Sequence, residues 1–229
     1  RLYSQSVTAG IWTRIEKLVA IGVIAKRYDG SYKIHGRSAE YYCTPLARHI
    51  LRDDSSLDER AIRQLYKRSS ASARFVQRSL ALLRITIALR ERYGDVVQMH
   101  TQVEIVGDRY ESYPQPLPDM FIAMNDVDGT ARHCFLDYYE DEVPLGIHAR
   151  RLRFYDRYYN DGDWSWKEFP DIIAVCASSH LKDRLARRMR YINDNDYLDV
   201  SAVSVACVDD LDSKGGIDWI NPLEADTVL

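Results

Sequence analysis

Apolar residues recur at helical spacing near the start of the chain. Ile11, Ile15 and Leu18 lie three or four positions apart, which predicts an amphipathic helix over residues 5–21. Gly22 follows, where a residue of left-handed backbone conformation would end the helix. The face opposite the apolar one carries side chains that are short or cationic, which suits a helix that lies in the major groove of DNA. The candidate DNA contacts of this helix are Gln5, Ser6, Thr8, Thr13, Arg14 and Lys17.

The alternative is a surface helix that packs on its neighbours and contacts no DNA. The next segment favours the DNA-binding interpretation. Its pattern predicts a strand over 23–27, a turn over 28–31 that contains the hairpin-forming pair Asp-Gly, and a return strand over 40–44. Pro45 then suits the first position of another helix.

Cationic side chains follow this predicted hairpin. A basic hairpin directly after an amphipathic helix is typical of the wing of a winged helix-turn-helix, whose cations contact DNA phosphates. The candidate phosphate contacts are Lys26, Arg27, Lys33, His35 and Arg37. Because the chain begins at Arg1 rather than at methionine, we expect the natural start, and the helix that precedes a recognition helix, to lie upstream.

Residues 57–93 form a strongly helical stretch. Val76, Leu80, Leu83 and Ile87 make a narrow apolar stripe, which could pair with a second copy in a homodimer. It could equally cover the core of its own domain or bridge two domains, and we favour this second interpretation.

From residue 95 onward, strand patterns alternate with helical ones. Strands are expected over 96–106, 117–124, 133–139, 171–177 and 200–208, and helices over 145–159 and 179–191. This alternation predicts an α/β domain with a mixed sheet, so the whole chain has an α+β or α/β organisation. The expected division is a winged-helix domain over 1–54, a helical connector over 55–94 and an α/β domain over 95–229.

Charge is divided unevenly between these parts. Residues 1–94 contain 18 Lys and Arg against 8 Asp and Glu, whereas residues 95–229 contain 13 against 26. A basic half joined to an acidic half suggests a nucleic-acid-binding part and a part with another task. The acidic half could also be only a solvated surface.

The cysteines and the apolar runs bear on location. Cys43, Cys134, Cys176 and Cys207 are widely spaced, and three of them stand in strand-like runs, so we expect reduced, buried thiols in a cytoplasmic protein. We see no apolar run long enough to span a membrane and no signal peptide, and therefore expect no membrane partner.

Two carboxylates of the second half could carry chemistry. If the hairpin folds about residue 128, Asp119 and Asp137 fall opposite each other on one sheet face. Such a pair suits Mg²⁺, and a Pro-Asp strand beside an acid-bearing strand is part of the nuclease pattern PD-(D/E)xK. The lysine position of that pattern, however, is Tyr139. We therefore prefer a structural role, in which Asp119 caps a turn or pairs with an arginine such as Arg151.

The other chemical signals are sparse. The histidines show neither helical pairing nor a cysteine at zinc spacing, and the sequence has no phosphate-binding glycine motif. An aromatic cluster runs over 154–159 and continues at Trp164 and Trp166. We expect it to pack a helix on the sheet, and stacking of single-stranded bases is the alternative.

The second half resembles the replication-relaxation family of plasmids and other mobile elements. The residues that carry the resemblance are Leu117–Phe121, Phe135–Glu140, Arg151–Tyr155, Trp164–Val175 and Arg184–Leu185. The family pattern has a second acid where this chain has Tyr139, and a helix lysine where it has Arg151. The resemblance implies a winged helix joined to a nuclease-like domain, and a role at an origin in replication, DNA relaxation or conjugative mobilisation.

Three hypotheses follow for function. The first is a double-stranded DNA-binding accessory protein without catalysis, working beside a partner such as a relaxase or replication protein. The second is a Mg²⁺-dependent nuclease or nickase that uses Asp119 and Asp137. The third is a transcriptional repressor of the same element. Only under the second hypothesis do we expect a cofactor.

Overall fold

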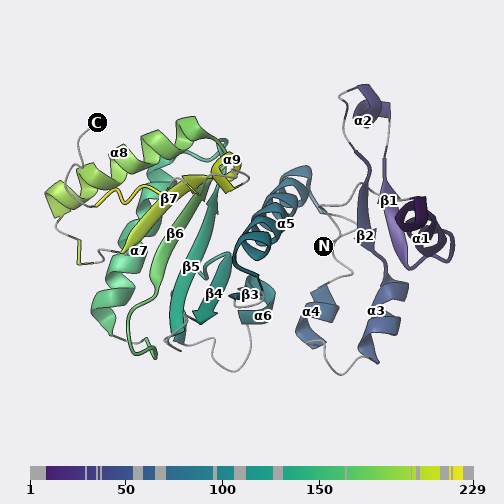
Figure 1. Cartoon of the computed structure of the whole chain (residues 1–229), viewed down its shortest axis with the longest axis horizontal. Coiled ribbons are helices and arrows are strands. Elements are labelled where there is room, and N and C mark those ends of the chain that lie inside the picture. Colours follow the sequence, from purple (N-terminus) through teal and green to yellow (C-terminus); the bar gives the residue numbers. More distant parts are fainter. Residues whose placement is uncertain are drawn as a thin grey trace. The chain divides into compact units, whose positions relative to one another are not determined.

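The chain forms two compact units, shown in Figure 1, which span Arg1–Val76 and Gln77–Leu229. The first is called here the N-terminal unit and the second the C-terminal unit. The computed structural model describes residues 9–28, 30–34, 36, 38–53, 59–64, 71–94, 97–105, 112–125, 131–162, 164–196, 198–199, 202–211, 217 and 219–223. Each unit is described below by itself.

The N-terminal unit consists of short helices and one antiparallel strand pair. Its elements are α1 (Ala9–Ala20), β1 (Ile24–Arg27), α2 (Gly30–Ile34), β2 (Glu40–Cys43), α3 (Pro45–Arg52) and α4 (Glu59–Gln64). The predicted helix, both strands and the helix that begins at Pro45 are all present. The N-terminal unit thus has the helix-then-hairpin order that the polar pattern predicts.

Backbone chemistry explains where α1 ends. Gly22 has a φ of 78°, and its N–H donates to the Val19 carbonyl at 3.0 Å while the Val23 N–H donates to the Leu18 carbonyl at 3.0 Å. This left-handed ending is the one that glycine tolerates best. The Thr44 hydroxyl then donates to the Gly22 carbonyl at 2.6 Å and accepts from the Ala47 N–H at 3.4 Å, so one side chain ties the end of α1 to the start of α3.

The connection of the hairpin contains a short helix that the pattern does not predict. The strands pair from Ile24 with Cys43 to Arg27 with Glu40, and within the connection Gly30 begins the short helix α2. The predicted turn over 28–31 is therefore wrong in its second half, because the chain is already helical from Gly30 onward. The Tyr32 hydroxyl, which donates to Glu40 Oε2 at 2.9 Å, fastens α2 to the base of β2.

The C-terminal unit is built on a mixed five-stranded sheet, as expected. Its strands follow the order β3-β4-β5-β6-β7, with β3, β4 and β5 antiparallel and β5, β6 and β7 parallel. The helix α5 (Ala73–Tyr93) begins just before the boundary between the units and lies mostly in this one. The elements that follow it are β3 (Val97–Thr101), α6 (Gln102–Ile105), β4 (Met120–Asn125), β5 (Ala131–Tyr139), α7 (Leu145–Asp161), β6 (Asp171–Cys176), α8 (Ser179–Asp196), β7 (Val203–Cys207) and α9 (Val208–Leu211).

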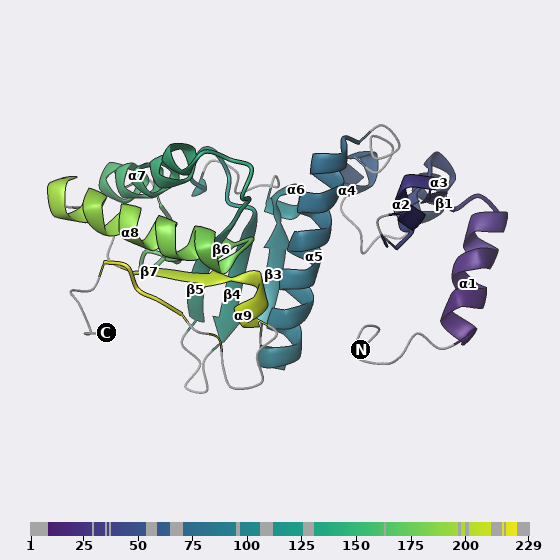
Figure 2. The ribbon, with the colours of Figure 1, turned by 90° about the horizontal axis from the view of Figure 1, so that it is seen from above.

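Helices cover both faces of this sheet. Figure 2 shows α7 and α8 along one face and α5 along the other. The unit has a hydrophobic core on each face of the sheet. Phe135 packs with Tyr155 and Leu185 in the core beneath α7 and α8, whereas its strand neighbour Leu136 packs with Ile85 in the core beneath α5. Successive strand residues point to opposite faces, so β5 contributes to both cores.

The long helix α5 covers the core of its own unit, but through a different stripe from the predicted one. Its buried residues are Ile85 and Leu89, whereas Leu80 and Leu83 of the predicted stripe are exposed. Apolar residues follow two neighbouring stripes of this helix, and the pattern alone does not show which of them faces the sheet.

Residues 102–105 also depart from the predicted strand, because they form α6. The Glu104 carboxylate accepts from the Thr101 N–H at 2.7 Å and from its hydroxyl at 2.8 Å. Thr-x-x-Glu is a capping-box spacing, in which the acid holds the first free backbone donor of a helix. This local signal outweighs the strand pattern.

Three cysteines are buried free thiols, as predicted. Burial is the main cause that raises the pKa of Cys134 and of Cys176 to about 12, and it also raises the pKa of Cys207. Thiols with pKa values that high are protonated at neutral pH and unreactive. Within the described ranges, no helix has both the length and the apolar character needed to cross a membrane.

Replacing Gly22 tests the ending of α1. A Cβ at this position would meet nothing within 4 Å, so the cost of Gly22→Ala is purely that of the left-handed backbone. We expect the free energy of unfolding to fall by about 1 kcal/mol, measured by urea denaturation. Gly146→Ala is the matched control: it also enters open space, but without positive φ inside α7, and should be neutral or stabilising. Equal effects would contradict this account.

Candidate functional site

The two predicted acids lie opposite each other. The register pairs Met120 with Leu136, and its continuation by one residue places Asp119 across from Asp137, as the folding point at residue 128 predicts. The Asp119 N–H donates to Asp137 Oδ1 at 3.3 Å. Both side chains are buried, each residue being 6% exposed, so their charges must be balanced locally.

Arg78 of α5 balances the first acid. Its Nη2 lies 2.5 Å from Asp119 Oδ2, and its Nη1 lies 3.1 Å from Glu140 Oε2 and donates to the Tyr138 carbonyl at 3.0 Å. The Tyr138 N–H also donates to Asp119 Oδ2 at 2.7 Å. The guanidinium therefore joins α5 to β5 and to the residue just before β4.

Arg151 of α7 balances the second acid. Its Nε donates to Asp137 Oδ2 at 2.7 Å and its Nη2 to Oδ1 at 3.3 Å, a two-point contact with one carboxylate. The Tyr155 hydroxyl donates to the same Oδ2 at 2.8 Å, and Arg151 Nη1 donates to the Pro116 carbonyl. The expected pairing of an acid with Arg151 is therefore present, but its partner is Asp137, and Asp119 pairs with Arg78.

Burial and charge shift the pKa values in this network. Burial, followed by the neighbouring charge of Asp137, raises the pKa of Asp119 against the opposing effect of Arg78. Burial first, and then Asp137, raises the pKa of Tyr155 well above its usual value. Tyr155 thus keeps its proton at neutral pH and acts as a donor to the carboxylate.

A histidine completes the edge of the network. His148 Nε2 lies 2.9 Å from the Glu140 carbonyl, and its ring meets Tyr139 edge-on at 4.8 Å between centroids. Burial is the main cause that lowers the pKa of His148. A neutral imidazole that donates from Nε2 to the carbonyl satisfies this geometry, and it gives His148 a structural role.

This network does not fit a magnesium site. The carboxylates of Asp119 and Asp137 contact guanidinium groups, and a tyrosine that is wholly buried stands at the lysine position of the nuclease pattern. Across the described parts of the chain, no group of three or more His, Cys, Asp or Glu residues is arranged to hold a metal ion. Guanidinium is a poor proton acceptor, so neither Arg78 nor Arg151 can serve as the base of the nuclease pattern.

The predicted DNA contacts fall into three groups. The first group is exposed to solvent: it consists of Thr13, Arg14 and Lys17 on α1, Lys26 on β1 and Lys33 on α2. Arg27 is half-buried, with Nη1 at 4.0 Å from Glu40 and Nη2 donating to the Ala71 carbonyl at 3.4 Å, so it holds the N-terminal unit together. The remaining candidates, Gln5, Ser6, Thr8, His35 and Arg37, lie outside the described residues.

The aromatic cluster of the second half mainly packs the core, as expected. Tyr155 stacks on Phe135 at 5.6 Å between centroids, and Tyr158 and Trp166 meet the same ring edge-on at 6.3 and 5.4 Å. These contacts attach α7 and the segment before β6 to the sheet. Packing therefore accounts for most of the cluster.

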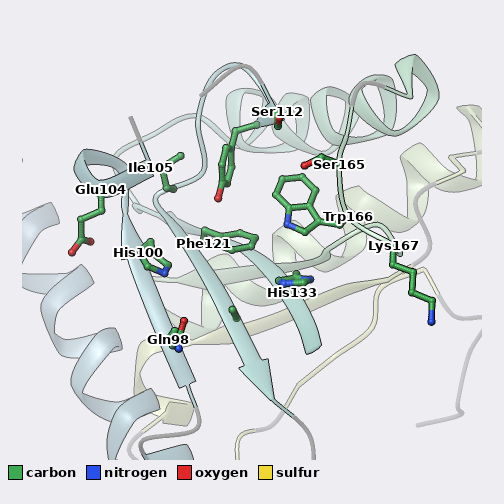
Figure 3. Close-up of a pocket in the computed structure, with 12 residues that line it drawn as sticks. Gln98, His100, Glu104, Ile105, Ser112, Phe121, His133, Ser165, Trp166 and Lys167 are labelled. Atoms are coloured by element: carbon green, nitrogen blue, oxygen red, sulfur yellow. The ribbon is translucent and has the colours of Figure 1, made fainter. Parts of the chain in front are cut away.

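Trp166 also forms a wall of an open cleft of about 650 Å³, shown in Figure 3. The floor is one sheet face, because Gln98, Ala123 and His133 are register partners across β3, β4 and β5. His133 stacks on Phe121 at 5.4 Å between centroids, and burial lowers its pKa. Ring faces beside a neutral imidazole suit a planar polar group.

Sequence reasoning missed a group of exposed arginines on α7 and α8. Arg150, Arg153 and Arg188 line one cleft between the two helices. Counting charge by halves concealed them, because the acidic residues of the C-terminal unit outnumber them elsewhere. Helical spacing within 145–161 and 179–196 would have shown them as exposed faces.

In comparisons with known proteins, no family model, curated protein or solved structure matches this chain. The resemblance to the replication-relaxation family therefore stays a prediction from short motifs.

Removing Arg151 tests the acid–arginine network. Arg151→Met leaves Asp137 buried with its charge uncompensated, and we expect the free energy of unfolding to fall by about 3 kcal/mol in urea denaturation. Arg157→Met, on the exposed side of the same helix, should change it by less than about 0.5 kcal/mol. Adding Asp137→Asn to Arg151→Met should recover part of the loss, because the stranded charge is gone. No loss in the single variant would refute the network's stabilising role.

Proposed function

We propose that this protein is a sequence-preferring double-stranded DNA-binding accessory protein that acts without catalysis. The observation that carries the proposal is the set of exposed residues Thr13, Arg14 and Lys17 on α1, followed directly by an antiparallel hairpin with exposed Lys26 and Lys33. A winged helix-turn-helix uses this order, in which the helix enters the major groove and the hairpin contacts phosphates.

The acid–arginine network supports a role without catalysis. Metal-dependent cleavage of DNA needs carboxylates that are free to bind cations and a base or positioned water. Here Arg78 and Arg151 occupy the carboxylates of Asp119 and Asp137. Their positive charges supply from within the protein the compensation that a metal ion would provide.

The family resemblance supplies the biological setting of the proposal. It favours action at an origin of a plasmid or mobile element in the cytoplasm, during replication, relaxation or conjugative mobilisation. The C-terminal unit would then contact a relaxase, a replication protein or a second copy in a homodimer. A repressor of the same element would use the same DNA-binding surface, and footprinting across the origin and the adjacent promoters separates the two roles.

Duplex binding should depend on the N-terminal cations. We expect Arg14→Ala/Lys17→Ala/Lys33→Ala to weaken binding at least tenfold and to lower the slope of log K against log[salt] by about three, as measured by fluorescence anisotropy. Arg90→Ala/Arg92→Ala/Lys167→Ala removes the same charge from exposed positions outside both proposed DNA contacts and should have a much smaller effect. Unchanged binding in the first variant would refute the DNA-binding surface.

A plasmid-nicking assay separates the proposed function from the nuclease alternative. With supercoiled plasmid and Mg²⁺ or Mn²⁺, we expect the wild-type protein and Asp119→Ala to show the same background level of nicking, because no free carboxylate pair is present. Metal-dependent nicking by the wild type that Asp119→Ala abolishes would replace the proposed function with that of a nickase.

A further inference from the structure

The strongest unassigned feature is the cleft between α7 and α8, called here the arginine cleft. It has a volume of about 340 Å³, and its described lining residues include no carboxylate. They are Pro144, Gly146, Ile147, Ala149, Arg150, Arg153, Arg188 and Ile192. Three guanidinium groups therefore line one small space in a unit whose overall charge is negative.

Helical geometry explains why these arginines face outward. Arg150 and Arg153 lie three residues apart on the exposed side of α7, whereas Arg151 between them reaches the buried acid network. On α8, Arg188 is exposed while its neighbour Met189 is fully buried. Because the opposite side of each helix is fixed in the core, the positions from which the guanidinium groups extend are fixed as well.

The start of α7 adds to the positive character of this space. The Pro144 cap makes no side-chain hydrogen bond to the first helical turn, and a Cβ at Gly146 would meet nothing within 4 Å. The free N–H groups of a first turn carry partial positive charge, which favours anions. The helix start and the guanidinium groups therefore act in the same direction.

We propose that the arginine cleft binds phosphate groups of a nucleic-acid backbone. Guanidinium forks match the oxygens of phosphate with two parallel hydrogen bonds, which makes arginine well suited to this anion. Exposed Arg157 continues the series on α7, and exposed Arg184 and Arg187 continue it on α8. A series of cations along two helices suits a chain of phosphates better than one small anion.

The inference concerns a different surface from the proposed function but rests on it for the identity of the ligand. Under it, the C-terminal unit contributes its own contacts to DNA, in addition to those of α1 and the hairpin. Phosphate chemistry could also come from a free anion, and the experiment therefore includes inorganic phosphate as a second probe.

The test uses the full chain and a labelled 30-base-pair duplex. We expect Arg150→Gln/Arg188→Gln to weaken binding about tenfold and to lower the slope of log K against log[salt] by about two, because two phosphate contacts are lost. Arg90→Gln/Arg92→Gln on α5 is the matched control, since it removes two exposed arginines and the same charge. Circular dichroism and urea denaturation confirm that both variants are folded.

The outcomes separate this inference from the proposed function. Loss of binding in the cleft variant, with little change in the α5 variant, supports the inference whether or not α1 and the hairpin also contribute. Equal changes in both variants would show a simple effect of net charge and overturn it, as would no change in either. Saturable binding of inorganic phosphate that the cleft variant loses, without any effect on DNA binding, overturns the assignment to nucleic acid.

Discussion

The C-terminal unit depends on the neutralisation of two carboxylates that its sheet brings face to face. Asp119 and Asp137 are opposite each other and buried, where unbalanced charge is costly. Arg78 from α5 and Arg151 from α7 provide the compensating charges from opposite faces of the sheet. These pairs connect the layers of the unit and fix how both helices sit on the strands.

The same interaction constrains the chemistry of the unit. Paired carboxylates can serve either as a metal-binding site or as part of structural ion pairs. Which of the two roles they have depends on whether a metal ion or a cationic side chain binds them. A guanidinium fork forms direct hydrogen bonds and remains charged at every relevant pH. Tyr155, protonated because burial raises its pKa, adds a neutral donor. The arrangement therefore favours a static network over a site that exchanges metal and water.

Local patterns predicted much of this architecture. Period-two alternation and a Gly-containing connection were enough to predict β4 and β5 and the opposition of Asp119 and Asp137. The partner Arg78 was not predictable, because it stands 41 residues before Asp119 and nothing in its local sequence distinguishes it from other helix arginines. The helix α6 was predictable in principle, since Thr101 and Glu104 have capping-box spacing. The short helix α2 is joined to β2 by a hydrogen bond from Tyr32 to Glu40, a contact that residue spacing does not reveal.

Helix α7 shows how one sequence segment can serve both surface and core. Arg150, Arg151 and Arg153 are near neighbours in the chain, but a period of 3.6 residues directs Arg151 toward Asp137 and the other two toward solvent. A charge count treats the three as equivalent. Their environments make the inner one part of the structural network and place the outer two along the arginine cleft. The acidic composition of this half therefore does not argue against contact with DNA, because local geometry determines which charges a partner meets.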